Sequence, residues 1–203
     1  EDCYPEDGLV VNVLSRDLPE QCNPDLPCEA KWNQDFLWYS RDEARKWLGA
    51  DPQPGDEHLV PHQLVSRVVR FHLVDNVKGQ TPHFSPDGTD GSRIPTAVLE
   101  RAGSAVTLKI SGTTRGVAGA GWWQSDNGVV TRLLGRAKFD LDRGKFTEFE
   151  IVALGRRWGY TRFNGRRRDP PAGPVGYVFR LATPESPRVA PANLPSYGAD
   201  WIQ

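Results

Sequence analysis

The chain has 203 residues, of which 38% are hydrophobic and 25% charged, with 7 Trp, 20 Gly, 17 Pro and a formal net charge of -1. This length and composition suit one globular domain with irregular ends and exclude a disordered chain. No run approaches the roughly 18 apolar residues that a bilayer-spanning helix needs, and the nearly neutral charge disfavours a nucleic-acid-binding module.

The three cysteines, Cys3, Cys22 and Cys28, all lie in the first 28 residues, in a stretch with little helix or strand pattern. A disulfide would constrain such a segment, and disulfides persist in oxidising compartments. The chain also contains no Met and opens on Glu1-Asp2-Cys3, as a precursor does after removal of an N-terminal segment. We therefore expect a disulfide among these cysteines and an extracytoplasmic location, periplasmic or secreted.

A capping box predicts the first helix, since Ser40 is followed three residues later by Glu43. We expect this helix to run from Arg41 to Leu48. The preceding residues, 1–35, show little periodicity, so they are expected to be irregular apart from a short strand at Leu9–Leu14.

A second helix is predicted from Pro61, because proline suits the first helical position. Apolar residues such as Leu64 and Val68 then recur every three or four positions, and the pattern runs to Asp75. Turn residues dominate residues 76–92, which form the longest predicted loop.

A first hairpin is predicted in AVLERAGSAVTLKI, because the apolar period changes here from 3.6 to 2. Val106, Leu108 and Ile110 share one face of the second strand. They follow a turn that contains glycine, and the opposite face is polar.

The sequence LLGRAKFDLDRGKFTEFEIVALG predicts a second hairpin, with a loop at residues 142–144 that places Gly144 where a left-handed backbone is needed. This register sets Lys138 opposite Glu148, Arg136 opposite Glu150, Ala137 opposite Phe149 and Phe139 opposite Thr147. Charge pairing and apolar pairing thus select the same register.

Further strands are expected at Trp158–Phe163 and Val175–Leu181, followed by an extended Pro-rich tail. Together the elements predict an α+β fold, with a curled antiparallel sheet or partly closed β-barrel of about six strands and two helices to one side. We assign residues 1–57 to an irregular acidic N-terminal segment with a short helix, 58–183 to the α+β core domain and 184–203 to an extended C-terminal tail.

Two segments, RFHLVDNVKGQTPHF and GRAKFDLDRGKFTEFEIVALGRRWG, resemble segments shared by an uncharacterised group of bacterial proteins that are expected to be exported. The resemblance covers about residues 60–182. It implies an exported protein but no assigned activity, catalytic residue or ligand.

Charge is distributed unevenly along the chain. Residues 132–168 hold eleven Lys and Arg against four Asp and Glu, whereas residues 1–57 hold five basic and fourteen acidic side chains. We expect the arginines of GRRWGYTRFNGRRRDPP to face carboxylates or carbonyls of the same assembly rather than phosphates. Arg166, Arg167 and Arg168 are also candidates for contacts with a partner.

Histidines cluster around the second predicted helix, where all four fall between residues 58 and 83. Histidine is a common zinc or copper ligand, so His62 and His72, with Asp75, are candidate metal ligands. The spacing matches no zincin pattern, and ordinary surface or capping roles are the alternative.

Aromatic side chains provide the other binding candidates. Trp122 and Trp123 lie in a glycine-rich connection, where they could stack on sugar rings, enter a pocket on a partner or fill the core. Tyr197 and Trp201 of the tail are expected to dock on this domain or on a partner.

No nucleophile elbow, P-loop, dinucleotide-binding pattern or redox CxxC occurs in the sequence. The leading hypothesis is a non-catalytic extracytoplasmic binding or scaffolding module, such as a membrane-extrinsic subunit of a larger protein assembly, with no cofactor. Peripheral membrane contact and carbohydrate binding stay open as alternatives. A histidine-based metal-binding protein or metalloenzyme is the second hypothesis, and a nucleic-acid binder is the third.

Overall fold

Strands dominate the fold because long segments of the chain alternate buried and exposed side chains. The structure, a computed structural model, describes residues 4–18, 32–122 and 124–197. Its strands are β1 (Leu9–Asp17), β2 (Trp32–Tyr39), β3 (Glu57–Leu59), β4 (Pro95–Ala102), β5 (Ala105–Ala118), β6 (Asn127–Asp140), β7 (Lys145–Trp158) and β8 (Ala172–Leu181). The helices are α1 (Arg41–Arg45) and α2 (His62–Phe71), with short 3-10 turns η1 (Asp87–Thr89) and η2 (Leu194–Ser196).

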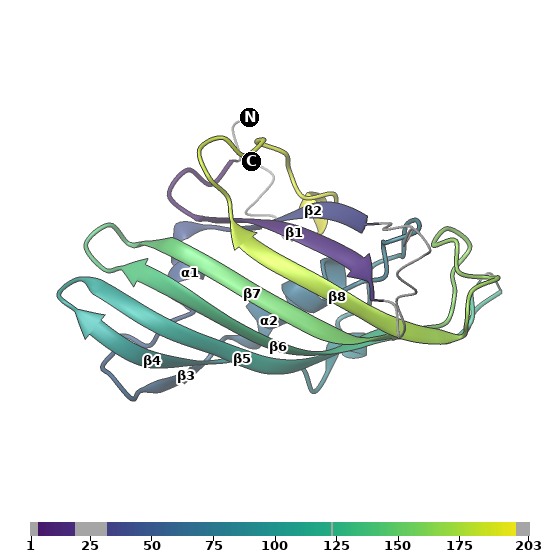
Figure 1. Cartoon of the computed structure of the whole chain (residues 1–203), viewed down its shortest axis with the longest axis horizontal. Coiled ribbons are helices and arrows are strands. Elements are labelled where there is room, and N and C mark those ends of the chain that lie inside the picture. The colour runs from purple at the N-terminus through teal and green to yellow at the C-terminus, as the bar shows by residue number, and fades with distance from the viewer. Residues whose placement is uncertain (1–3, 19–31, 123, 198–203) are drawn as a thin grey trace, which may run out of the picture.

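These strands form one antiparallel sheet in the order β2-β1-β8-β7-β6-β5-β4-β3, which is open because β2 and β3 form its two edges. Both α-helices lie on the same side of the curved sheet (Figure 1). The predicted antiparallel sheet is therefore confirmed. The expected strand number, about six, is wrong because the described residues form a sheet of 8 strands.

Two hairpins follow the predicted pattern closely. In the first, Val106, Leu108 and Ile110 all have 0% exposure, as their alternation predicted. In the second, Arg136 pairs with Glu150 and Lys138 with Glu148, so the charge pairing predicted the register correctly.

The predicted pairing of Phe139 with Thr147 is wrong by one residue. A β-bulge after Lys138 shifts the register, so that Phe139 pairs with Phe146. The bulge leaves Thr147 exposed and keeps both phenylalanines buried, with their ring centroids 5.0 Å apart. Gly144 has a φ of 67°, as the predicted turn requires.

The helices begin where their sequence signals indicate and end early. The Ser40–Glu43 capping box is present, but α1 ends at Arg45. Helix α2 ends at Phe71, four residues before the predicted end, and Pro61 is its N-cap.

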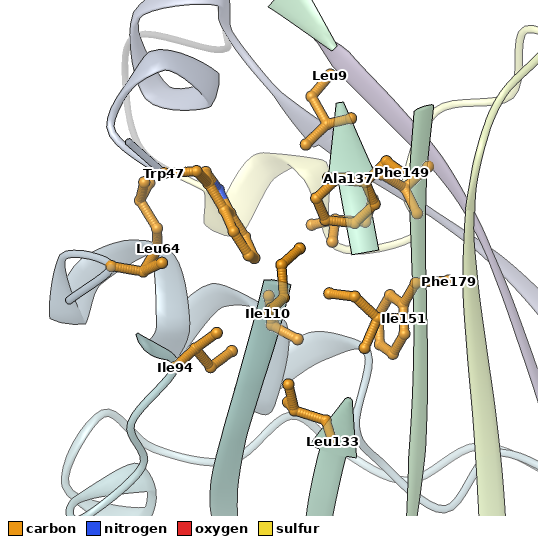
Figure 2. Close-up of a cluster of buried hydrophobic side chains, with 14 of the residues drawn as sticks. Leu9, Trp47, Leu64, Ile94, Ile110, Leu133, Ala137, Phe149, Ile151 and Phe179 are labelled. Carbon is orange, nitrogen blue, oxygen red and sulfur yellow. The ribbon is translucent and has the colours of Figure 1, made fainter. Parts of the chain in front are cut away.

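The core lies between the sheet and the helices. Figure 2 shows Trp47 and Leu64, from the helical side, in one buried cluster with Ile110 and Ile151 of the sheet. Tyr39 closes this core and donates a hydrogen bond to the Leu64 carbonyl at 2.8 Å. The sheet therefore has one face covered by helices and one face directed away from them.

The N-terminal segment is more ordered than the sequence indicated. The strand predicted at Leu9–Leu14 is confirmed and extends to Asp17 as β1, whereas the expectation of irregular structure is wrong for residues 32–35, which begin β2. Strand β1 pairs with both β2 and β8. The predicted acidic segment therefore extends the core sheet.

The C-terminal tail contacts both faces at the β2 edge. Leu194 packs in a small cluster with Val10, Phe36 and Trp38, and Tyr197 packs against both this cluster and the main core. The tail therefore covers side chains of the edge strand β2.

Tyr197 attaches the tail to α2 through specific contacts. Its hydroxyl lies 2.6 Å from Nε2 of His72, whose Nδ1 lies 2.7 Å from an Asp35 carboxylate oxygen. Its ring stacks on Phe71, and the Arg67 guanidinium lies 4.5 Å from the ring centroid. Burial raises the pKa of the Tyr197 hydroxyl well above its usual value, so this group stays protonated at neutral pH.

We predict that Tyr197→Ala lowers the free energy of unfolding by about 2–4 kcal/mol, because it removes a buried ring and leaves His72 without one partner. Val189→Ala, in an exposed part of the tail, should change it by less than about 0.5 kcal/mol. Urea denaturation of both variants measures the difference. Equal stability of the two variants would show that the docked tail does not stabilise the domain.

Candidate functional site

Arg166 anchors the β7–β8 loop with all five of its N–H donors. Nε and Nη2 donate to the two Asp75 oxygens at 2.8 and 2.6 Å. Nη1 and Nη2 donate to the two Asp17 oxygens at 2.7 and 2.8 Å, and Nη1 also donates to Asp169 at 2.9 Å. The guanidinium therefore connects the end of β1, the segment after α2 and the β7–β8 loop.

The charges around this anchor balance. Lys78 donates to Asp169 at 2.6 Å, and Arg157 lies 3.7 Å from the same carboxylate, so three cations face three carboxylates. Burial alone would lower the pKa of the Arg166 guanidinium, but its hydrogen bonds to Asp17 and Asp75 outweigh that effect and raise it. Arg166 therefore stays charged although its side chain has 0% exposure.

The rest of this loop is ordered by its own side chains. The backbone N–H of Thr161 donates to Asn164 Oδ1 at 3.0 Å, and the N–H of Asn164 donates to Thr161 Oγ1 at 3.1 Å. Gly165 follows with a φ of 67°, a conformation that favours glycine.

The predicted strand at Trp158–Phe163 is therefore wrong, since β7 ends at Trp158 and a turn follows. The alternation of buried and exposed side chains that a strand would show is also absent. Thr161 and Asn164 are buried, whereas Arg162 and Phe163 are exposed.

The β7–β8 loop and the β5–β6 loop lie at the same end of the sheet (Figure 1). Residues of both loops line one cleft. The N–H of Ser125 donates to the Tyr160 carbonyl at 3.1 Å, and the N–H of Tyr160 donates to Ser125 Oγ at 2.9 Å. The resulting loop-end cleft has a volume of about 550 Å³ and is lined by Trp122, Tyr160, Thr161, Arg162, Gly165, Arg167 and Arg168.

The loop-end cleft combines aromatic surface with positive charge. Trp122 is 87% exposed, and Tyr160 is 37% exposed. Among the described residues, no carboxylate forms an ion pair with Arg162, Arg167 or Arg168. The cleft is therefore suited to an anionic group attached to a flat or apolar body.

The structure separates the three consecutive arginines that the sequence proposed for partner contacts. Arg166 is internal and cannot reach a partner in the folded protein, whereas Arg167 and Arg168 line the loop-end cleft with Trp122. Arg157 also turns inward and donates to the Pro170 carbonyl at 3.1 Å. The expectation that the arginines face groups of the same chain therefore holds for Arg157 and Arg166.

The three candidate metal ligands do not come together. His62 is the first residue of α2 and His72 follows its last residue, so about 15 Å separates them along the helix. His72 has both ring nitrogens engaged by Asp35 and Tyr197, and Asp75 binds Arg166. Within the described residues, no group of three or more His, Cys, Asp and Glu is arranged to hold a metal.

Some predicted features lie outside the described residues: Cys3, Cys22, Cys28, Trp123 and Trp201. The disulfide therefore stays a prediction. Conversely, the carboxylate partners of Arg166 could not be identified from the sequence, because Asp17 and Asp75 are 149 and 91 residues away along the chain.

Comparison with known proteins gives no relative for this chain: no family model, curated protein or solved structure matches it. Neither α-helix among the described residues is long and apolar enough to cross a membrane. The geometry of the chain itself is therefore the basis for its proposed function.

We predict that Arg166→Met lowers the free energy of unfolding by about 3–5 kcal/mol, because Asp17 and Asp75 would be left close together without their shared cation. Arg167→Ala and Arg168→Ala should each cost less than about 0.5 kcal/mol, since both side chains are exposed. Chemical denaturation of the three variants measures this contrast. An Arg166→Met protein as stable as the other two would contradict the anchoring role.

The pH dependence of stability should reveal the contribution of the Asp169 carboxylate. Burial raises the pKa of this carboxyl, but hydrogen bonds from Lys78 and Arg166 outweigh it and hold the pKa below the usual 3.8. Its contribution to stability is thus present above about pH 4 and is lost as pH falls through the lower, folded-state value. Asp169→Asn should therefore show a smaller loss of stability than wild type on acidification from about pH 5 to pH 2.

Proposed function

We propose that this protein is a non-catalytic extracytoplasmic binding module, and that its loop-end cleft binds an acidic segment of another protein. The observation that carries the proposal is the convergence of Trp122, Tyr160, Arg162, Arg167 and Arg168 on one open cleft. Trp, Tyr and Arg are the residue types that most often dominate the binding energy of protein interfaces.

The charge of the cleft supports an acidic partner. Arginine binds carboxylates through two parallel hydrogen bonds, and Arg167 and Arg168 are exposed beside an exposed indole. An incoming carboxylate would meet cations that no carboxylate of the described chain already occupies.

The rigidity of the loop supports binding as well. Arg166 fixes the backbone directly before Arg167, and the Thr161–Asn164 hydrogen bonds fix the backbone on either side of Arg162. A preformed cleft loses less conformational entropy on binding than a mobile one. The Arg166 anchor thus helps to hold the cleft in its binding conformation.

The extracytoplasmic location rests on the gathering of three cysteines within 28 residues. An exported protein meets acidic protein segments more readily than nucleic acid, which would also suit an arginine cleft. Binding to nucleic-acid phosphates would be distinguished by its salt dependence. The slope of log affinity against log salt concentration should be nearly one unit steeper for each phosphate neutralised.

The proposal predicts that Arg167→Ala/Arg168→Ala weakens partner binding by about tenfold or more, equivalent to at least about 1.4 kcal/mol. Affinity capture from the exported fraction of the native source, with quantitative mass spectrometry, would identify the partner. Titration of the purified partner would then give both affinities.

The matched control is Lys109→Ala/Arg115→Ala, which removes two exposed cations from β5 without touching the cleft. It should bind like wild type. Equal losses in both double variants would indicate a nonspecific charge effect and contradict the proposal. Binding of single-stranded DNA that is steeply salt-dependent and lost only in the cleft variant would instead favour nucleic-acid recognition.

A further inference from the structure

The sheet face directed away from the helices carries a row of apolar side chains. Leu134 pairs with Val152, Val152 with Val178, and Val178 with Leu14, so the row crosses four adjacent strands. Leu134 is 60% exposed and Val152 is 40% exposed. The solvent face of an antiparallel sheet is ordinarily polar, and a contiguous apolar patch marks an interaction surface.

A neighbouring row adds a hollow. Here Leu154 pairs with Gly176, and Arg16 pairs with Gly176 and Trp32. Because Gly176 has no side chain, a hollow of about 320 Å³ remains above it, walled by Leu18, Leu154 and Trp32. We call the set Leu14, Trp32, Leu134, Val152, Leu154 and Val178 the outer-face stripe.

Positive charge borders the outer-face stripe. Arg136 and Arg180 flank Glu150 in the row on one side, and Arg16 and Arg132 lie within the row that contains the hollow. Glu150 already accepts a hydrogen bond from Arg180 at 3.1 Å. No carboxylate of the described residues forms an ion pair with Arg16, Arg132 or Arg136.

We infer that the outer-face stripe is a second docking surface, which binds an acidic amphipathic helix of a partner protein. The row spans three interstrand spacings, about 14 Å, and a helix of about ten residues has the same length. An apolar side chain of this helix enters the hollow above Gly176. Its acidic residues face Arg16, Arg132 and Arg136.

Charge and shape select this occupant over two others. A second copy docked through the same stripe would bring arginine borders together, and such like-charge contacts are unfavourable. A lipid surface offers no protruding side chain to fill a hollow of this shape. A helix with acidic flanks satisfies the charge and the hollow together.

Selection from a displayed library of random 16-residue peptides on the full chain tests the inference. The enriched peptides should repeat apolar residues every three or four positions and carry Asp or Glu beside them. Gly176→Val should weaken their binding about tenfold, because it fills the hollow. The strand should tolerate this change, since the atoms nearest to the new Cβ are the side-chain ends of Leu18 and Leu154, at 3.3 and 3.4 Å.

Two controls separate the outcomes. Thr147→Val places the same side chain on an exposed β7 position, seven residues before Leu154 and away from the hollow, and should bind like wild type. Arg167→Ala/Arg168→Ala should also leave this binding unchanged, so failure of the loop-end cleft and failure of the stripe are distinguishable. The inference is overturned if no peptide is enriched, or if enriched peptides bind Gly176→Val as tightly as wild type.

Light scattering and vesicle binding complete the test. A dimer that Gly176→Val dissociates would overturn the inference in favour of self-association. Binding to phosphatidylglycerol vesicles that the same substitution abolishes would overturn it in favour of a lipid surface. A monomeric protein that does not bind vesicles and binds the acidic peptides supports the inference.

Discussion

The buried guanidinium of Arg166 is the interaction on which the loop end of this molecule depends. It joins carboxylates of three distant segments, and each of its N–H groups has a partner. A buried cation is costly unless it is fully paired, so the three segments are constrained to one arrangement. The Arg166 anchor therefore also positions its exposed neighbours Arg167 and Arg168.

The open sheet divides the molecule into surfaces with different roles. Its inner face packs against α1, α2 and Trp47 and forms the core. At β2 the tail packs on side chains of the sheet, and its Tyr197 contacts His72. No helix of the described residues covers the loop end or the outer face, and both combine apolar side chains with cations. Under both proposals, the module would hold two parts of an acidic assembly together.

Sequence reasoning succeeded where neighbouring residues carry the information. The hairpin charges placed Arg136 opposite Glu150, and the capping box marked the start of α1. It failed at β2, whose polar first half resembles a loop and forms a strand because β1 is available to pair with it. It also failed after Trp158, where Thr161 and Asn164 bond to the backbone in place of a neighbouring strand.

The sequence by itself determined the antiparallel sheet, the two hairpins and the helix starts, because turn chemistry, capping and period-2 alternation act over a few residues. It also identified Trp122, Arg167 and Arg168 as binding candidates. Only the tertiary structure decided that Arg166 is internal and that His62 and His72 are apart. The reason is that the partners of a buried charge, and the gathering of loops into a cleft, depend on contacts between residues far apart in the chain.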